Sequence, residues 1–245
     1  MQEKSILKRF AILDWLVVII LLVLGVFAKR ARFPSDFIPY LNTDIDEPTK
    51  TTTVSKIVLY PTIVVGGIIV LISFGIFKRE LLSQILASYS FSIVFTLLVV
   101  SLLQRMIGRP RPDTKSYCGA TFLECSFNLN EKQLNEQFKS FPSLESALSM
   151  ASGIFISFFI IESWKKFSVF QALISLLPVF LAIFYGACEI WDRNSHIDDV
   201  VTGYFIGGII SIFTFKSLLK SIRGSDEYSE DQQHLSDSVL LRFAH

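Results

Sequence analysis

From Phe10 to Ala28 the chain reads FAILDWLVVIILLVLGVFA, in which Asp14 is the single charged residue. About 17 to 25 apolar residues in a helix are enough to cross the hydrocarbon core of a bilayer. The run therefore predicts a membrane-spanning helix. Basic residues precede it, as in a signal peptide, but it is long for a signal core and is followed by a poor cleavage site. We expect a retained first helix.

Similar apolar runs recur along the whole chain. Apolar residues make up 51% of the sequence and charged residues 18%, and the mean hydropathy is +0.50, which is typical of membrane proteins rather than soluble ones. The net charge of +1 gives no reason to expect nucleic acid as a partner. The sequence predicts an all-α fold, a bundle of six transmembrane helices, with the further runs near 56–77, 81–104, 144–163, 168–187 and 197–219.

Charge placement predicts the orientation and the domain boundaries. Lys78 and Lys165 lie in the two shortest loops, and lysine and arginine in short loops mark the cytosolic side. Both termini then lie in the cytosol, and the loops after the first, third and fifth spans face the lumen or exterior of the plasma membrane or an endomembrane. Residues 1–223 are expected to form one membrane domain, and the polar segment 224–245 a flexible cytosolic tail.

Asp14 and the three cysteines have expected places in this fold. Asp14 lies near the start of the first span, where we expect it at the headgroup level as a helix cap. Cys118 and Cys125 share the long loop after the third span, which is compatible with a disulfide or with two thiols. Cys188 is expected to be a packed thiol. The spacing of His and Cys residues does not suit zinc, and no metal or cofactor is expected.

Three polar stretches stand at the ends of the predicted spans. Residues 104–113 read QRMIGRPRPD, residues 141–146 read FPSLES, and residues 188–200 read CEIWDRNSHIDDV. Each alone could be an ordinary basic turn, a capped helix start or an acidic helix entry. They follow the third span, open the fourth and join the fifth to the sixth. All three are therefore expected to meet on one side of the membrane.

In order and spacing these stretches resemble the signatures of the type 2 phosphatidic acid phosphatase family, the lipid phosphate phosphatases. Those signatures are Lys-x6-Arg-Pro, Pro-Ser-Gly-His and Ser-Arg-x5-His-x3-Asp. The resemblance implies removal of phosphate from phosphatidate and related lipid phosphates without a metal. One histidine attacks phosphorus and is held by the aspartate, a second protonates the leaving group, and a lysine and two arginines bind the phosphate oxygens.

The resemblance assigns the phosphate pocket to Gln104, Arg111, Ser143, Leu144 and Glu189, of which the first four lie in the first two stretches. Arg111, Ser143 and the two prolines beside them match the family pattern. Gln104 stands where the family has its lysine, and Leu144 stands where it has glycine. Glu145 replaces the histidine that protonates the leaving group. The pocket implied by the resemblance thus keeps one arginine and loses a lysine charge and the acid.

The third stretch departs from the pattern in a similar way. Asp199 matches the aspartate, but Ser195 replaces the attacking histidine and Glu189 replaces an arginine. His196 lies where many members carry a second, non-catalytic histidine. Adjacent residues on a helix point about 100° apart, so we expect His196 not to share the face of Asp199. We also expect Arg111 or a neighbouring arginine to pair with Glu145 or Glu189.

These departures predict a pseudoenzyme of the family that binds phosphatidate-like lipids and has little or no phosphatase activity. Catalytic residues are expected to be absent, with family positions occupied by Glu145, Ser195 and Asp199. One alternative is an active phosphatase with a rearranged site that uses His196. Another is a scaffold or regulator of membrane partners, as a homo-oligomer or with another membrane protein. A channel or transporter has little support, because ionisable residues lie only near the span ends.

Overall fold

The computed structural model describes most of the chain as helices joined by turns, and no strand occurs among the described residues, so the expected all-α class is confirmed. The described ranges are 2–30, 48–51, 53, 56–75, 82–118, 128–163 and 169–243. The basic loops that predict the orientation, with Lys78 and Lys165, lie outside them, as does Cys125. Cys118 is buried and disulfide-bonded, and Cys188 is a buried free thiol.

Five helices of the described part are long and apolar enough to cross a membrane. The chain is a multi-pass integral membrane protein. The five candidate spans are Ile12–Arg30 within α1 (Gln2–Arg30), α4 (Leu82–Ile107), α8 (Leu144–Ser163), α9 (Val169–Trp191) and Ile197–Ile222 within α10 (Ile197–Phe243).

The second expected span, 56–77, differs from the single helix that its hydropathy predicts. It consists of α2 (Lys56–Pro61), the π-helical segment η2 (Thr62–Gly66) and α3 (Gly67–Gly75). Pro61 has no N–H to donate, so the regular hydrogen-bond ladder is interrupted here. The Tyr89 hydroxyl on α4 donates to the Ile63 carbonyl at 2.6 Å, which satisfies one carbonyl of the π turn. That this region forms a sixth crossing stays a prediction.

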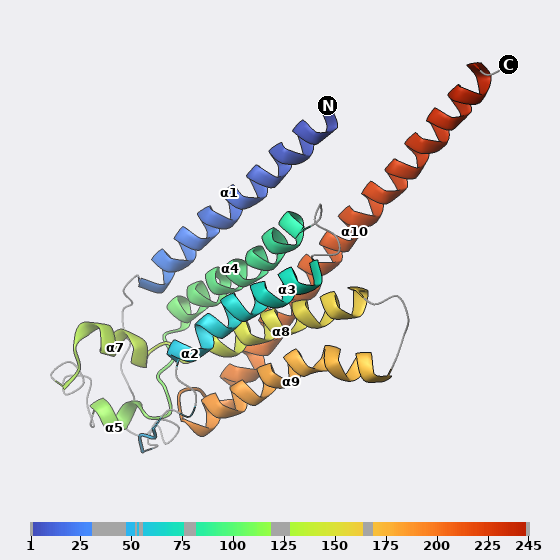
Figure 1. The fold of residues 1–245 in the computed structure, drawn as a ribbon. Coiled ribbons are helices and arrows are strands. Elements are labelled where there is room, and N and C mark those ends of the chain that lie inside the picture. The colour runs from blue at the N-terminus through green and yellow to red at the C-terminus, as the bar shows by residue number, and fades with distance from the viewer. Residues whose placement is uncertain are drawn as a thin grey trace.

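Helix α8 occupies the centre of the bundle (Figure 1). It is the most buried of the five spans and packs against α4, α9 and α10, while α1 packs against α4. Phe155 of α8 forms edge-to-face ring pairs with Tyr89 and Phe215, with centroids 5.4 and 5.3 Å apart. These contacts form one apolar core in the half of the bundle away from α5 (Thr114–Cys118) and α7 (Glu131–Gln137).

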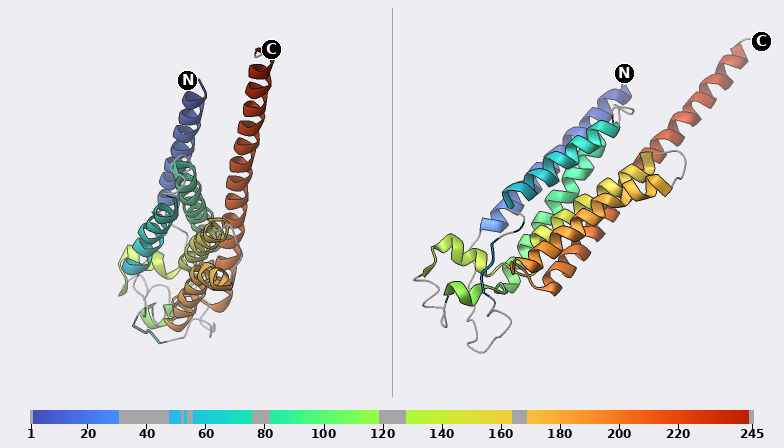
Figure 2. Two further views of the ribbon diagram at one scale, coloured as in Figure 1. Left: turned by 45° about the vertical axis from the view of Figure 1, so that its right-hand side comes forward. Right: turned by 60° about the horizontal axis from the view of Figure 1, so that its bottom comes forward.

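Both termini lie at the end of the bundle opposite to α5 and α7, as all views show (Figures 1 and 2). Helix α10 continues without a break to Phe243. The segment from residue 224 was expected to be flexible, and it is helical through Phe243. Its polar sequence carries no proline that would stop the helix. The division of the chain at residue 223 stays a prediction.

Candidate functional site

The three polar stretches meet at the α5 and α7 end of the bundle. The backbone N–H of Ser143, before α8, donates to the carbonyl of Asp199 in α10 at 3.0 Å. Arg109, after α4, reaches the same aspartate through its guanidinium. Segments distant in sequence thus form one site, which extends from the ends of α4 and α9 to the starts of α8 and α10.

The carboxylate of Asp199 is the centre of this site and is fully buried. Arg109 Nη1 lies 2.7 Å from its Oδ1. Its Oδ2 accepts from the Ser140 hydroxyl, from the backbone N–H of His196 at 2.8 Å, and from the ring of His196. Arg109 also binds the exposed carboxylate of Asp198. A buried carboxylate is costly without such partners, so the four contacts explain how Asp199 is accommodated.

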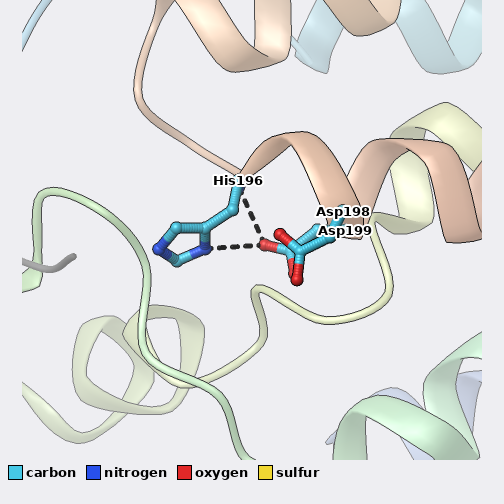
Figure 3. A group of neighbouring side chains, drawn as sticks. All are labelled: His196, Asp198 and Asp199. Atoms are coloured by element: carbon cyan, nitrogen blue, oxygen red, sulfur yellow. Dashed lines mark hydrogen bonds and ion pairs between the residues drawn. The ribbon is translucent and has the colours of Figure 1, made fainter.

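His196 contacts Asp199 directly, which corrects the prediction that the two would face apart. The Nδ1 of His196 lies 2.9 Å from Asp199 Oδ2, and Figure 3 shows both contacts to this oxygen. Helix α10 begins at Ile197, so His196 precedes the helix and the 100° rotation between neighbours does not apply to it. A proton on Nδ1 that bonds Asp199 leaves Nε2 with its lone pair, pointing away from the carboxylate.

Ser195, at the family position of the attacking histidine, is buried and makes no side-chain hydrogen bond within the described part of the chain. The aspartate that would orient a nucleophile there instead holds the neighbouring ring of His196. A serine hydroxyl needs a base to become a nucleophile, and none contacts it. The imidazole that contacts Asp199 thus belongs to the residue after Ser195.

His196, Asp198 and Asp199 offer one ligand atom each within 4.8 Å of one another, an arrangement that could hold a metal ion (Figure 3). Arg109 already binds both carboxylates. Its guanidinium supplies positive charge where a cation would sit, so the donor set does not fit a metal without displacement of Arg109. Burial opposes the charge of Arg109, but hydrogen bonds and attraction from both aspartates raise its pKa above the ordinary value.

Arg111 lies beside this group and is largely buried, with a side chain 13% exposed. Its Nη1 donates to Asn194 Oδ1 at 3.4 Å, and its Nη2 lies 3.9 Å from Glu136. Its Nε is buried and has no hydrogen-bond partner in the described part of the chain. Neither Arg109 nor Arg111 contacts Glu145 or Glu189, so the expected pairing is wrong for these two arginines.

The carboxylates that replace a histidine and an arginine are instead bonded to tyrosines. Tyr60 of α2 donates to Glu145 Oε1 at 3.1 Å, and Tyr185 of α9 donates to Glu189 Oε1 at 2.8 Å. Both glutamates are buried. A hydroxyl donor stabilises a buried carboxylate without a formal opposite charge. The tyrosines were not singled out in the sequence. Tyr185 precedes Glu189 by four residues on α9, the spacing that places two side chains on one helix face, whereas no spacing rule links Tyr60 to Glu145.

The other pocket positions hold the backbone in place. Gln104 Nε2 donates to the carbonyls of Lys139 and Pro142 at 3.0 and 2.9 Å, so its amide ties the end of α4 to the turn before α8. Ser143 donates to the hydroxyl of Ser146, and its Oγ accepts from the Ser146 N–H. Leu144 is buried in the apolar core of α8. The side chains of Gln104, Ser143 and Leu144 thus make contacts within the protein itself.

A cavity of about 780 Å³ opens beside Glu145. The ends of α1 and α2, helix α7 and the start of α8 surround it, and Lys29, Arg30, Lys132 and Lys139 bring positive charge to its lining. Lys29 Nζ lies 3.4 Å from the hydroxyl of Tyr60, the residue that bonds Glu145. The lining of the cavity therefore combines cations with three glutamates. One of them is Glu145, which the resemblance places where the family has the proton-donating histidine.

A scan against family models matches residues 85–223, more than half of the chain, to the PAP2 superfamily. The five candidate spans and the three stretches at one end of the bundle agree with that match. The chain belongs to the PAP2 superfamily, and it is a homologue of lipid phosphate phosphatases.

Three relatives illustrate the relationship. A probable diacylglycerol pyrophosphate phosphatase 1 of Schizosaccharomyces pombe is 30% identical over 135 residues, 49% of this chain and 48% of that protein. Lipid phosphate phosphatase 2 of Arabidopsis thaliana is 25% identical over 84% of this chain and 77% of that protein. Probable lipid phosphate phosphatase 4 of the same plant is 24% identical over 82% and 70%.

The match covers about half the length of the yeast relative. No solved structure gives a significant match to this chain.

Proposed function

We propose that this membrane protein binds the phosphate group of a phosphatidate-like lipid beside Arg111 and His196, and that its hydrolysis of phosphomonoesters is severely impaired. The site faces the lumen or exterior, and both termini face the cytosol. The observation that carries the proposal is the buried pair Glu145 and Glu189, which stand where the family has a proton-donating histidine and an arginine.

The impairment rests on charge and on the missing acid. At an effective dielectric near 20, two unit charges about 4 Å apart interact by about 4 kcal/mol, so an arginine replaced by Glu189 turns a large attraction into repulsion. Gln104 adds no charge, and its amide is occupied by two backbone carbonyls. An alkoxide leaves a phosphomonoester slowly unless an acid protonates it. Glu145, bonded to Tyr60, replaces the histidine that would do so.

Binding is supported by the groups that remain. Arg111 has a buried Nε without a hydrogen-bond partner among the described residues, a donor that a phosphate oxygen would satisfy. His196 presents its second ring nitrogen away from Asp199 (Figure 3). The Arg111 guanidinium suits an anion at the membrane surface, and the imidazole would donate to it from Nε2 when both ring nitrogens carry a proton.

Binding can be measured with purified protein in phosphatidylcholine nanodiscs titrated with fluorescent phosphatidate. We expect saturable binding that Arg111→Gln weakens by about tenfold, the value of one charge-assisted contact. Arg193→Gln is the matched control, because Arg193 lies in the same turn region and donates to the carbonyl of Pro48 instead. Equal affinity of the wild type and Arg111→Gln would contradict the proposed binding site.

The contact between His196 and Asp199 favours a second candidate, a phosphatase with a rearranged site. Here His196 Nε2 would attack phosphorus and form a phosphohistidine, with Asp199 orienting the ring. Without an acid, the favoured substrate is a lipid pyrophosphate, because the departing phosphomonoester is a much better leaving group than an alkoxide. The yeast relative carries the name of such an enzyme.

Turnover of diacylglycerol pyrophosphate separates the two candidates. The rearranged phosphatase predicts phosphate release and a phosphohistidine that can be trapped on the wild type, both absent in His196→Ala. The binding protein predicts neither. Asp198→Asn serves as the control, because Asp198 is exposed and pairs with Arg109, whereas Asp199 holds the ring of His196.

A further inference from the structure

A second cavity, of about 600 Å³, lies at the end of the bundle opposite to the His196 site. Helices α1 and α10 both pack against α4, and the cavity is formed between them with α4 beneath it. Its apolar lining includes Val17, Phe91 and Phe213, which suits a hydrocarbon chain. We call it the Asp14 cavity, after the carboxylate in its wall.

Among the described residues, Asp14 is the only charged one that lines this cavity. It lies inside the candidate span of α1, well after the helix start at Gln2, so it is not the helix cap that its sequence position suggests. Within the described part of the chain its carboxylate makes no hydrogen bond or ion pair. An ionisable residue in a membrane span usually has a partner, and no cation occurs among the described residues that line this cavity.

The neutral polar groups of the cavity also favour a ligand rich in donors. Thr214 donates its hydroxyl proton to the Ile210 carbonyl at 2.8 Å, and Ser217 donates to the Phe213 carbonyl at 2.9 Å. With their protons used, these two hydroxyls offer lone pairs to the cavity. Gln84 and Ser88 add further polar groups from α4. A carboxylate and two acceptor hydroxyls match a head group with several N–H and O–H donors.

We propose that the Asp14 cavity binds an amphipathic lipid whose head carries an ammonium and hydroxyl groups but no phosphate, such as a long-chain amino alcohol. The ammonium pairs with Asp14, the hydroxyls bond the polar groups of α4 and α10, and the chain lies along Val17 and Phe213. A phosphate or a fatty acid carboxylate would meet the negative charge of Asp14, and the described lining offers no cation to bind it. A sterol would offer Asp14 one hydroxyl donor and no positive charge.

The test uses a photoactivatable analogue of 2-aminooctadecane-1,3-diol and the purified full chain in phosphatidylcholine nanodiscs. We expect saturable labelling that the unlabelled amino alcohol suppresses. Its N-acetylated form keeps the chain and hydroxyls but lacks the charge, and it should compete at least about tenfold less well. Asp14→Asn should weaken binding by a similar factor.

The matched control is Glu162→Gln, which removes an exposed carboxylate near the same end of the bundle, in the last turn of α8. Ser88→Leu, which fills the cavity and keeps Asp14, should also reduce labelling, and it serves if Asp14→Asn does not fold. Equal competition by the N-acetylated lipid, or labelling that Asp14→Asn and Ser88→Leu leave unchanged, would overturn the proposal. Neither result depends on phosphate binding at Arg111.

Discussion

Arg109 Nη1 lies 2.7 Å from Oδ1 of the fully buried Asp199 and joins the segment after α4 to the first turn of α10. Loss of one partner of a buried ion pair leaves an uncompensated charge. Asp199→Asn should therefore lower the free energy of unfolding by about 3 kcal/mol. Asp198→Asn, which removes the exposed partner of the same arginine, should cost less than about 1 kcal/mol. Chemical denaturation in detergent checks this, and equal losses would contradict it.

Gly207 and Gly208 of α10 offer a test of the packing of α10 on α8. A Cβ at Gly207 would collide with the carbonyl oxygen of Ala147, which is rigid helix backbone. A Cβ at Gly208 would meet the Ile154 side chain at 3.2 Å, and that side chain can move. Gly207→Ala should cost about 1 to 3 kcal/mol or more in unfolding free energy. Gly208→Ala should be nearly neutral, and a neutral Gly207→Ala would contradict the close helix contact.

Asp113, in the turn before α5, predicts a dependence of stability on pH. Burial raises its pKa, and the charge of Arg111 offsets only part of this effect. A raised pKa means that the fold favours the protonated acid, so the contribution of Asp113 is greatest below its unfolded pKa of about 4 and is lost as pH rises. Asp113→Asn should raise the melting temperature at pH 7, and the gain should shrink as pH falls to about 4. A gain that is constant with pH would contradict this.

The hydropathy of the chain predicted the long helices, because a bilayer requires apolar runs of a set length. The polar stretches predicted which helix ends meet, because successive spans cross the membrane in alternating directions. The sequence could not place His196. The orientation of its side chain depends on whether α10 begins before or after His196. If the helix began one residue earlier, His196 would lie on a helix face, whereas in the structure it is the residue that precedes the helix.

The partners of the buried acids were also beyond the sequence. Ser140 donates to Asp199 and Tyr60 donates to Glu145, but neither donor belongs to a recognisable sequence motif. The sequence indicates only that buried carboxylates need hydrogen-bond donors, and it does not say which residues supply them. Arg109 could have been found from the basic turn that contains it, because a buried carboxylate needs a cation. The split of the second span was signalled by Pro61, but its π-helical form depends on the contact with Tyr89.

The proposed orientation can be tested with impermeant labels. Lys132 in α7 is exposed and lies at the end of the bundle opposite to both termini (Figure 1). In plasma-membrane protein, a maleimide added outside intact cells should label Lys132→Cys in a Cys188→Ser background. Antibodies against tags at both termini should bind only after permeabilisation. The reverse pattern would show that the His196 site faces the cytosol.

The central claim is tested most directly by the turnover of phosphatidate by purified wild type and His196→Ala. The account predicts that the wild type releases phosphate at the background rate of His196→Ala, because Glu145 and Glu189 replace the acid and an arginine. A variant with Glu145→His, Glu189→Arg and Ser195→His should gain activity if these replacements cause the loss. Robust wild-type turnover of phosphatidate that His196→Ala abolishes would contradict the account and establish the rearranged phosphatase.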